Sequence, residues 1–123
     1  MIINLWKETI SKLEAYGLTW DDVEMVWIED TWDTKQPDGW RITKEHFESL
    51  ARDMIYNNDF GGTEVNEGLH MMGHNKAGTP FIMFRNEYDG SEWWEVHLLN
   101  TDLPVKEVKN LGNFPFEERW SDE

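Results

Sequence analysis

PFIMFRNEYDGSEWWEVHLLN, residues 80–100, contains two strand-type segments separated by the pair Asp89-Gly90. Asp-Gly between apolar segments is typical of a two-residue type I′ turn, which needs positive φ at both central residues. A turn at this pair predicts a β-hairpin with a defined register. In that register Tyr88 faces Ser91, Arg85 faces Trp94, Met83 faces Val96, and Ile82 faces His97 on the opposite side.

Both faces of this hairpin are predicted to be apolar. Trp93 and Trp94 are adjacent, so their side chains point to opposite faces of the strand. Helices can cover only one of these faces. We expect at least one of the two tryptophans to be a core residue. The other face is left for the C-terminal tail, a second copy of the chain or a target.

Apolar spacing and capping residues predict the other elements. They are a helix from Ile2 to Gly17, a strand from Asp22 to Asp30, a helix from Lys44 to Tyr56 capped by Thr43, a strand from Glu64 to Met72, and a short helix from Pro104 to Gly112. This order predicts one α+β domain over residues 1–123, with an antiparallel sheet of about three to four strands and two main helices packed on one face. The tail from about residue 113 is expected to be ordered only as far as its aromatic residues dock.

The composition narrows the class of protein. Eleven Lys and Arg stand against 25 Asp and Glu, which gives a net charge of −14. The negative electric field of such a chain repels nucleic acid and anionic membranes and favours a basic host protein as partner. The alternative is that the charge serves only to keep the protein soluble. The chain has no Cys, which excludes disulfides, thiolate zinc sites and Cys nucleophiles. No apolar run is long enough to span a bilayer, and we expect a cytoplasmic location in the host cell.

A family resemblance adds to these inferences. The segment EYDGSEWWE (residues 87–95), preceded by FGGTEV (residues 60–65) and by a strand that ends at Gly73, resembles a family of small proteins encoded by tailed phages and prophages. The similarity runs from about Met25 to Leu99. It implies a phage origin. The family has no established activity, so the resemblance supplies no catalytic residues.

A metal site is one hypothesis from the histidines. His70 and His74 are four residues apart, and Glu67 could provide a third ligand for zinc, which accepts His nitrogen and carboxylate oxygen. His97 lies on the neighbouring hairpin, on the same or the opposite face. The alternative is that these are ordinary polar residues of a strand and its turn. A metal site would make the protein a metal-binding accessory or hydrolytic protein.

An acidic, aromatic binding surface is the leading hypothesis. Carboxylates spaced beside Trp can imitate a phosphate backbone with its stacked bases and so occupy a basic groove of another protein. No nucleophile, phosphate loop or His–carboxylate signature accompanies them, so no catalytic residues and no enzyme activity are predicted. We therefore expect a phage-encoded inhibitor of a Cas effector, an anti-CRISPR protein, with a self-assembling phage component as another alternative. The candidate partner-binding residues are Glu29, Asp30, Asp33, Glu87, Asp89, Glu92, Trp93 and Trp94.

Overall fold

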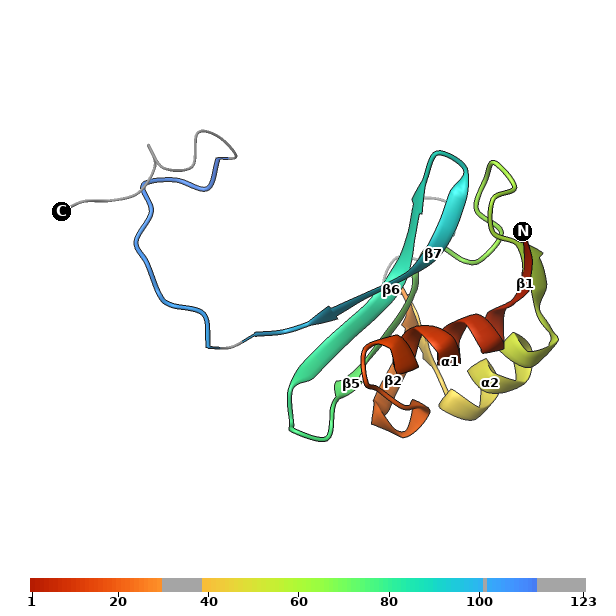
Figure 1. Ribbon diagram of the computed structural model, residues 1–123, viewed down its shortest axis with the longest axis horizontal. Coiled ribbons are helices and arrows are strands. Elements are labelled where there is room, and N and C mark those ends of the chain that lie inside the picture. The colour runs from red at the N-terminus through yellow and green to blue at the C-terminus, as the bar shows by residue number, and fades with distance from the viewer. Residues whose placement is uncertain (30–38, 101, 113–123) are drawn as a thin grey trace.

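The computed structural model describes residues 1–29, 39–100 and 102–112. They form an α+β fold in which two helices pack against one face of an antiparallel sheet (Figure 1). The sheet has five strands, in the order β3-β2-β5-β6-β7. Their bounds are Trp40–Ile42 (β3), Val23–Ile28 (β2), Leu69–His74 (β5), Pro80–Tyr88 (β6) and Ser91–Leu98 (β7).

The α+β class and the two helices are confirmed, but the predicted number of strands is too small. A second, two-stranded sheet pairs β1 (Ile2–Asn4) with β4 (Ile55–Asn57). The strands that sequence analysis missed, β1, β3 and β4, have three residues each. Three residues are too few to show the alternation of apolar and polar positions that identifies a strand.

The hairpin formed by β6 and β7 has the predicted register. Tyr88 pairs with Ser91, and the pairing continues without a shift to Phe81 and Leu98. Asp89 has φ of 52° and Gly90 has φ of 85°, as a type I′ turn requires. The local turn chemistry therefore determines which side chains of β6 and β7 share a face.

Both helices begin at a polar capping residue, and of the two only Thr43 was predicted. The side chain of Asn4 accepts the N–H of Lys7 at the start of α1 (Leu5–Ala15), and Thr43 accepts the N–H of His46 at the start of α2 (Lys44–Asp53). The helices are shorter than predicted. Residues 2–4 and 55–57 pair with each other as β1 and β4, so the start of the first predicted helix and the last two residues of the second lie in strands.

Two other predicted elements differ in the structure. The strand predicted from Glu64 starts only at Leu69, because the backbone of residues 64 and 65 bonds instead to a side chain of β7. The predicted helix from Pro104 is absent from the described residues 102–112. The side chains of Val105 and Leu111 there are 98% and 95% exposed, and a helix this short needs tertiary packing to be stable. The tail from residue 113 lies outside the described residues.

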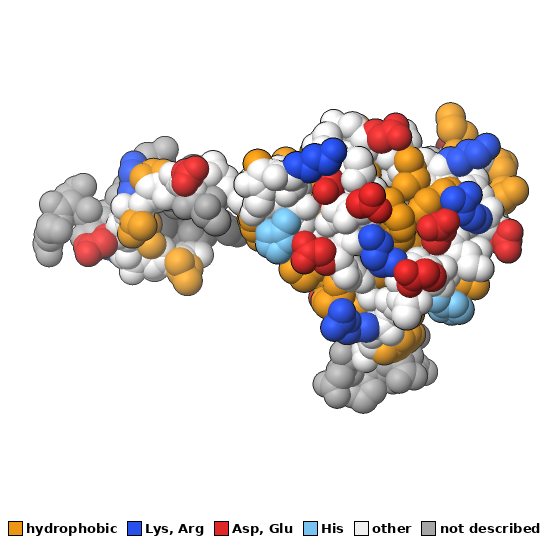
Figure 2. Space-filling model, turned by 90° about the horizontal axis from the view of Figure 1, so that it is seen from below, with side chains coloured by type: hydrophobic (Ala, Val, Ile, Leu, Met, Phe, Trp, Pro, Cys, Tyr) orange, Lys and Arg blue, Asp and Glu red, His pale blue; other side chains and the backbone are white. Residues whose placement is uncertain are grey.

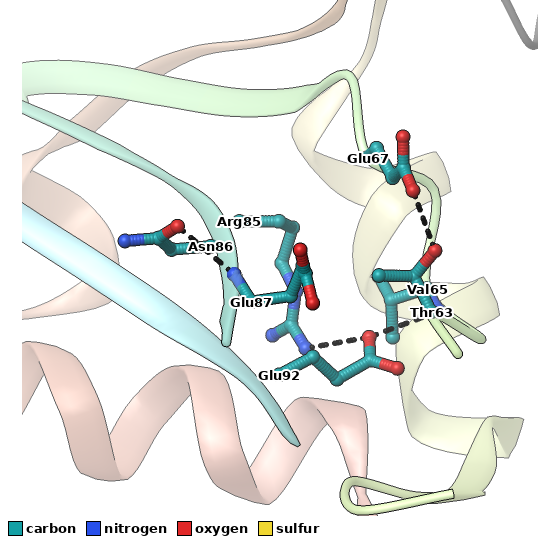
Figure 3. A pocket seen from close by; sticks show the side chains of 7 residues that line it. All are labelled: Thr63, Val65, Glu67, Arg85, Asn86, Glu87 and Glu92. Atoms are coloured by element: carbon teal, nitrogen blue, oxygen red, sulfur yellow. Dashed lines mark hydrogen bonds and ion pairs between the residues drawn. The ribbon is translucent and has the colours of Figure 1, made fainter. Parts of the chain in front are cut away.

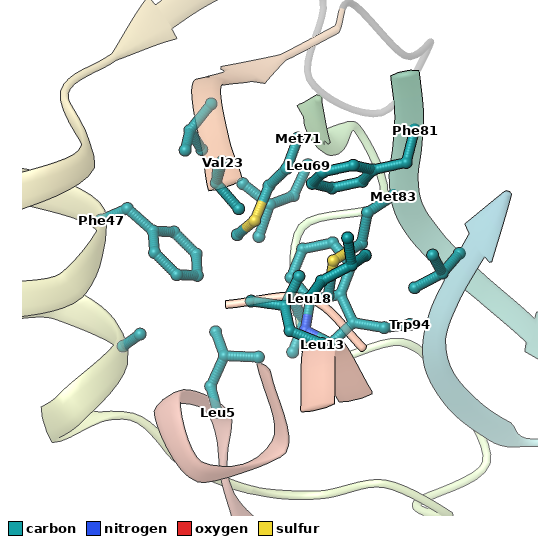
Figure 4. Packing of buried hydrophobic residues seen from close by; sticks show 14 of the residues in the cluster. Leu5, Leu13, Leu18, Val23, Phe47, Leu69, Met71, Phe81, Met83 and Trp94 are labelled. Atoms are coloured by element: carbon teal, nitrogen blue, oxygen red, sulfur yellow. The ribbon is translucent and has the colours of Figure 1, made fainter. Parts of the chain in front are cut away.

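The core lies between the helices and the inner face of the five-stranded sheet (Figure 4). Trp94 of β7 is at its centre and is completely buried. Its indole N–H donates to the hydroxyl of Thr9 over 2.9 Å, and that hydroxyl donates to the carbonyl of Leu5. The prediction that one of the paired tryptophans belongs to the core is therefore confirmed.

Candidate binding surface

The other face of the sheet, which we call the outer face, points away from both helices. Its residues alternate along each strand with residues of the core. Most of its side chains are partly buried by their neighbours in the sheet rather than by a second layer of the described chain. The outer-face residues include Met25, Trp27, Arg41, His70, Met72, His74, Ile82, Phe84, Asn86, Trp93, Glu95 and His97.

A row of four rings, the ring stack, crosses the outer face from β2 to β7. Its ring centroids are 5.2 Å apart from Trp27 to His70, 5.9 Å from His70 to Phe84 and 5.5 Å from Phe84 to His97. Interplanar angles of 22–37° mean that the rings turn their faces toward one another. The stack therefore offers ring edges to a ligand. Nucleobases stack on ring faces, so this surface is a poor platform for single-stranded nucleic acid.

Carboxylates at both ends of the ring stack are held by neighbouring side chains. Glu29 accepts the indole N–H of Trp27 over 3.2 Å, and Glu95 accepts that of Trp93 over 2.8 Å. The hydrogen bond from Trp93 holds the pKa of Glu95 below its usual value, because it favours the charged form. Beside them, a carboxylate oxygen of Glu24 lies 2.6 Å from Nδ1 of His74.

The predicted metal ligands are not brought together. Four residues along an extended strand separate His70 from His74 by about 13 Å, whereas zinc ligands all lie about 2 Å from one ion. Nδ1 of His70 lies 2.7 Å from the carbonyl oxygen of Gly68, and Glu67 accepts the hydroxyl of Thr63 in a different part of the fold. Among the described residues no group of three His, Asp or Glu side chains could hold a metal ion. Zinc therefore has no support from the structure.

Glu92, a predicted partner-binding residue, lies in the interior instead. It is only 3% exposed, and its carboxylate accepts the backbone N–H groups of Glu64 and Val65 over 2.6 and 3.1 Å. It also accepts a hydrogen bond from the guanidinium of Arg85 over 3.1 Å (Figure 3). Such a carboxylate fastens the loop before β5 to the hairpin and cannot reach a partner.

Arg85 joins Glu92 to two further elements. Its guanidinium donates to Glu8 of α1 over 3.2 Å and to the hydroxyl of Tyr56 in β4 over 2.9 Å. The hydroxyl of Tyr56 in turn donates to Glu8, and burial raises the pKa of Tyr56. A pocket of about 220 Å³ lies beside this network. It is lined by Thr63, Val65, Glu67, Arg85, Asn86, Glu87 and Glu92 (Figure 3).

The other predicted partner-binding residues fall in three places. Glu29 flanks the ring stack and Trp93 lies on the outer face, while Glu87 and Asp89 are exposed at the hairpin turn. Trp94 is a core residue, so its predicted contact with a partner is wrong. Asp30 and Asp33, which were also predicted to bind a partner, lie outside the described residues.

Sequence analysis missed the ring stack and the Trp–Glu pairs beside it, although the signal for these pairs was present. Trp27 and Glu29 are two residues apart, as are Trp93 and Glu95, and this spacing puts both members of each pair on one face of a strand. The positions of His70, Phe84 and His97 in one row depend on the pairing of β5, β6 and β7. That pairing cannot be obtained from spacing along the chain.

Comparisons with known proteins give no indication of function, so the function has to be inferred from the surface itself. No helix among the described residues is long and apolar enough to cross a membrane. The chain matches no protein-family model, no curated protein and no solved structure.

Proposed function

We propose that this protein is a non-catalytic, phage-encoded inhibitor that binds a basic surface of a host nucleic-acid-handling protein. The most concrete target is a Cas effector, which would make the chain an anti-CRISPR protein. The observation that supports this proposal is the set of carboxylates on and beside the outer face, those of Glu24, Glu29 and Glu95, each in contact with a neighbouring side chain.

These carboxylates are suited to Arg and Lys side chains of a partner. An ionised carboxylate has about four acceptor positions. Trp27 occupies one on Glu29, and Trp93 and Asn86 together occupy two on Glu95, which leaves the others for a guanidinium or ammonium group. Because those bonds already orient the carboxylates, less side-chain entropy is lost when a partner binds. The edges of the ring stack between them exclude water from part of the interface.

The helix side is less suited to a basic partner. Figure 2, which views the molecule from below Figure 1, shows Lys and Arg side chains intermixed with Asp and Glu. Glu48 and Arg52 of α2, for example, form an ion pair of 2.9 Å. The electric fields of neighbouring positive and negative charges largely cancel at distances beyond a Debye length. The helix side therefore attracts a basic surface less strongly than the outer face does.

The test is DNA cleavage by a panel of purified RNA-guided nucleases, with the protein added before or after the DNA. We expect inhibition only when the protein is added before the DNA, and weaker inhibition as salt is raised, because exposed ion pairs are screened. The variant Glu24→Lys with Glu29→Lys should lose inhibition. The matched control Glu14→Lys with Asp53→Lys makes the same change in charge on the helices and should keep it.

Three results would contradict the proposal. The first is the absence of inhibition and of binding across the panel. The second is equal loss of inhibition in the outer-face variant and the helix control, which would indicate a response to net charge alone. The third is inhibition that does not depend on the order of addition, because a protein that competes for a nucleic-acid groove must reach it first.

A further inference from the structure

Three of the four histidines in the chain lie on the outer face, and each has a glutamate beside it. The imidazole nitrogen and the carboxylate oxygen of each pair are 2.6 Å apart in His74–Glu24, 3.7 Å in His70–Glu29 and 4.0 Å in His97–Glu95. These are the three carboxylates that support the proposed function. An imidazole ordinarily gains its proton between about pH 8 and pH 5, so the charge beside each carboxylate depends on pH in this range.

The hydrogen bonds identify the ring nitrogen that takes up the proton. In His70, Nδ1 lies 2.7 Å from the carbonyl oxygen of Gly68, which can only accept, so Nδ1 carries a hydrogen in the neutral ring as well. The same holds for Nδ1 of His74 beside the carboxylate of Glu24. Nε2 is therefore the titrating nitrogen of both rings. In His70 this nitrogen is the one that faces Glu29, and protonation gives it a hydrogen to donate there.

Two of the imidazoles gain a second attraction when they are charged. His70 lies between the rings of Trp27 and Phe84, with centroids 5.2 and 5.9 Å away, and His97 lies 5.5 Å from Phe84. A cation within about 6 Å of an aromatic centroid is attracted to the ring face. The ring stack therefore accommodates protonated histidines without being taken apart.

Other charged groups near the histidines come from neighbouring elements. Arg41 of β3 lies on the outer face opposite Trp27, and Lys12 of α1 acts on the carboxylate of Glu95. Arginine and lysine side chains ordinarily keep their charge between about pH 5.5 and pH 8. Glu95 stays ionised in this range, because the hydrogen bond from Trp93 holds the pKa of its carboxyl below the usual value. Among these groups, the imidazoles are the ones that change charge.

We propose that His70, His74 and His97 form a pH-sensitive switch that controls the binding of a basic partner to the outer face. With neutral imidazoles, the three glutamates present their negative charge to the partner. Protonation places three positive charges beside these three negative ones and pairs each carboxylate within the chain. The face then attracts Arg and Lys side chains only weakly, and the partner is released. This inference rests on the proposed function, because it concerns the regulation of the same surface.

The test measures the binding of fluorescein-labelled octa-arginine to the full chain by fluorescence anisotropy at constant ionic strength. Arginine keeps its charge throughout, so the change with pH comes from the protein. We expect the dissociation constant to rise about tenfold from pH 8 to pH 5.5. The variant Glu24→Lys with Glu29→Lys should bind the peptide weakly at both pH values, as expected if the outer face holds it.

Variants that cannot take up a proton isolate the contribution of the histidines. The side chains of His74 and His97 are 46% and 59% exposed, so the double variant His74→Asn with His97→Gln should fold. The ratio of its dissociation constants at pH 5.5 and pH 8 should fall to about twofold, because one of three similar contributions remains. The matched control His46→Gln removes an exposed imidazole from α2 and should keep the tenfold ratio.

Nitrogen-15 NMR of the imidazole rings in the free protein gives an independent readout. At pH 8 the hydrogen of His70 and His74 should be found on Nδ1, as their hydrogen bonds require. At pH 5.5 both nitrogens of all three outer-face imidazoles should carry hydrogen. Rings that remain neutral at pH 5.5 would overturn the switch.

The binding assay also separates the switch from the proposed function. Equal affinity at pH 8 and pH 5.5, or an undiminished pH response in the double histidine variant, overturns the switch alone. A different pair of results contradicts the proposed function and the switch together. These are no binding of octa-arginine at pH 8, and equally tight binding to the Glu24→Lys, Glu29→Lys variant, because the outer face would then not attract a basic partner.

Discussion

At the scale of single residues, Arg85 joins several elements of the fold through one buried side chain. Its side chain is 3% exposed and bonds to Glu8 and Glu92, which come from α1 and β7. Its guanidinium also lies 5.1 Å from the ring of Trp94. Its Nε has no hydrogen-bond partner in the described structure. One cation thus compensates two carboxylates that have little access to water.

Replacing Arg85 should therefore be costly. Arg85→Met keeps much of the side-chain volume but leaves Glu8 and Glu92 without their counter-charge, and we expect a loss of roughly 3–5 kcal/mol in the free energy of unfolding. Urea denaturation measures it. The control Arg52→Met removes an exposed ion pair and a contact with a Trp ring, and should cost at most about 1 kcal/mol. Equal losses in the two variants would show that Arg85 has no special role.

The adjacent tryptophans give a second test at this scale. Trp94→Ala should lower the free energy of unfolding by roughly 3–5 kcal/mol, because it empties the centre of the core and removes a donor to Thr9. Trp93→Ala, on the outer face, should cost only about 1–2 kcal/mol, because its side chain is partly exposed. Thermal melts of the two variants check the difference. Similar melting temperatures would contradict the assignment of one tryptophan to each face.

At the scale of elements, the hairpin turn is constrained twice. Gly90 needs positive φ for the type I′ turn, and a Cβ added there would lie 3.0 Å from Cα of Gly61. The N–H of Gly61 donates to the carbonyl of Gly90 over 3.1 Å, so the loop before β5 rests directly on the turn. The turn therefore sets the register of β6 and β7 and also anchors that loop.

Gly90→Val should lower the free energy of unfolding by at least about 1 kcal/mol, because a β-branched residue resists positive φ and would press on Gly61. The matched control is Gly62→Val. Gly62 has no positive φ, and an added Cβ there would have nothing within 4 Å. Chemical denaturation of both variants provides the comparison. An unchanged denaturation midpoint for Gly90→Val would contradict the type I′ turn and its contact with Gly61.

At the scale of the whole molecule, the net charge of −14 makes the acidic side chains repel one another, and this repulsion destabilises the compact folded state. The Debye length falls from about 30 Å at 0.01 M salt to about 8 Å at 0.15 M. Raising the salt concentration in this way screens the repulsion and should stabilise the fold by about 1 kcal/mol, which corresponds to a rise of roughly 4 °C in Tm. Calorimetry at pH 7 measures it. Near the isoelectric point of 4.5 the same addition of salt should have little effect, and a fall in Tm at pH 7 would contradict the argument.

The sequence by itself determined the parts of this protein that depend on neighbours along the chain. The Asp89-Gly90 turn fixes the hairpin register, and Thr43 marks the start of α2, because backbone hydrogen bonds to adjacent residues decide both. Such local signals fail where packing is needed to complete an element. The predicted helix from Pro104 has a good first residue, yet its apolar side chains find no core in the described structure and no helix forms.

Only the tertiary structure decided which distant side chains meet. Glu8, Tyr56, Arg85 and Glu92 come from four elements, and their contacts turned an apparently exposed carboxylate into a buried one. The pairing of β2, β5, β6 and β7 aligned the ring stack, and the extended form of β5 kept His70 and His74 apart. The reason is physical: spacing along the chain specifies which face of a strand a residue occupies, whereas the strand beside it is chosen by the packing of the whole core.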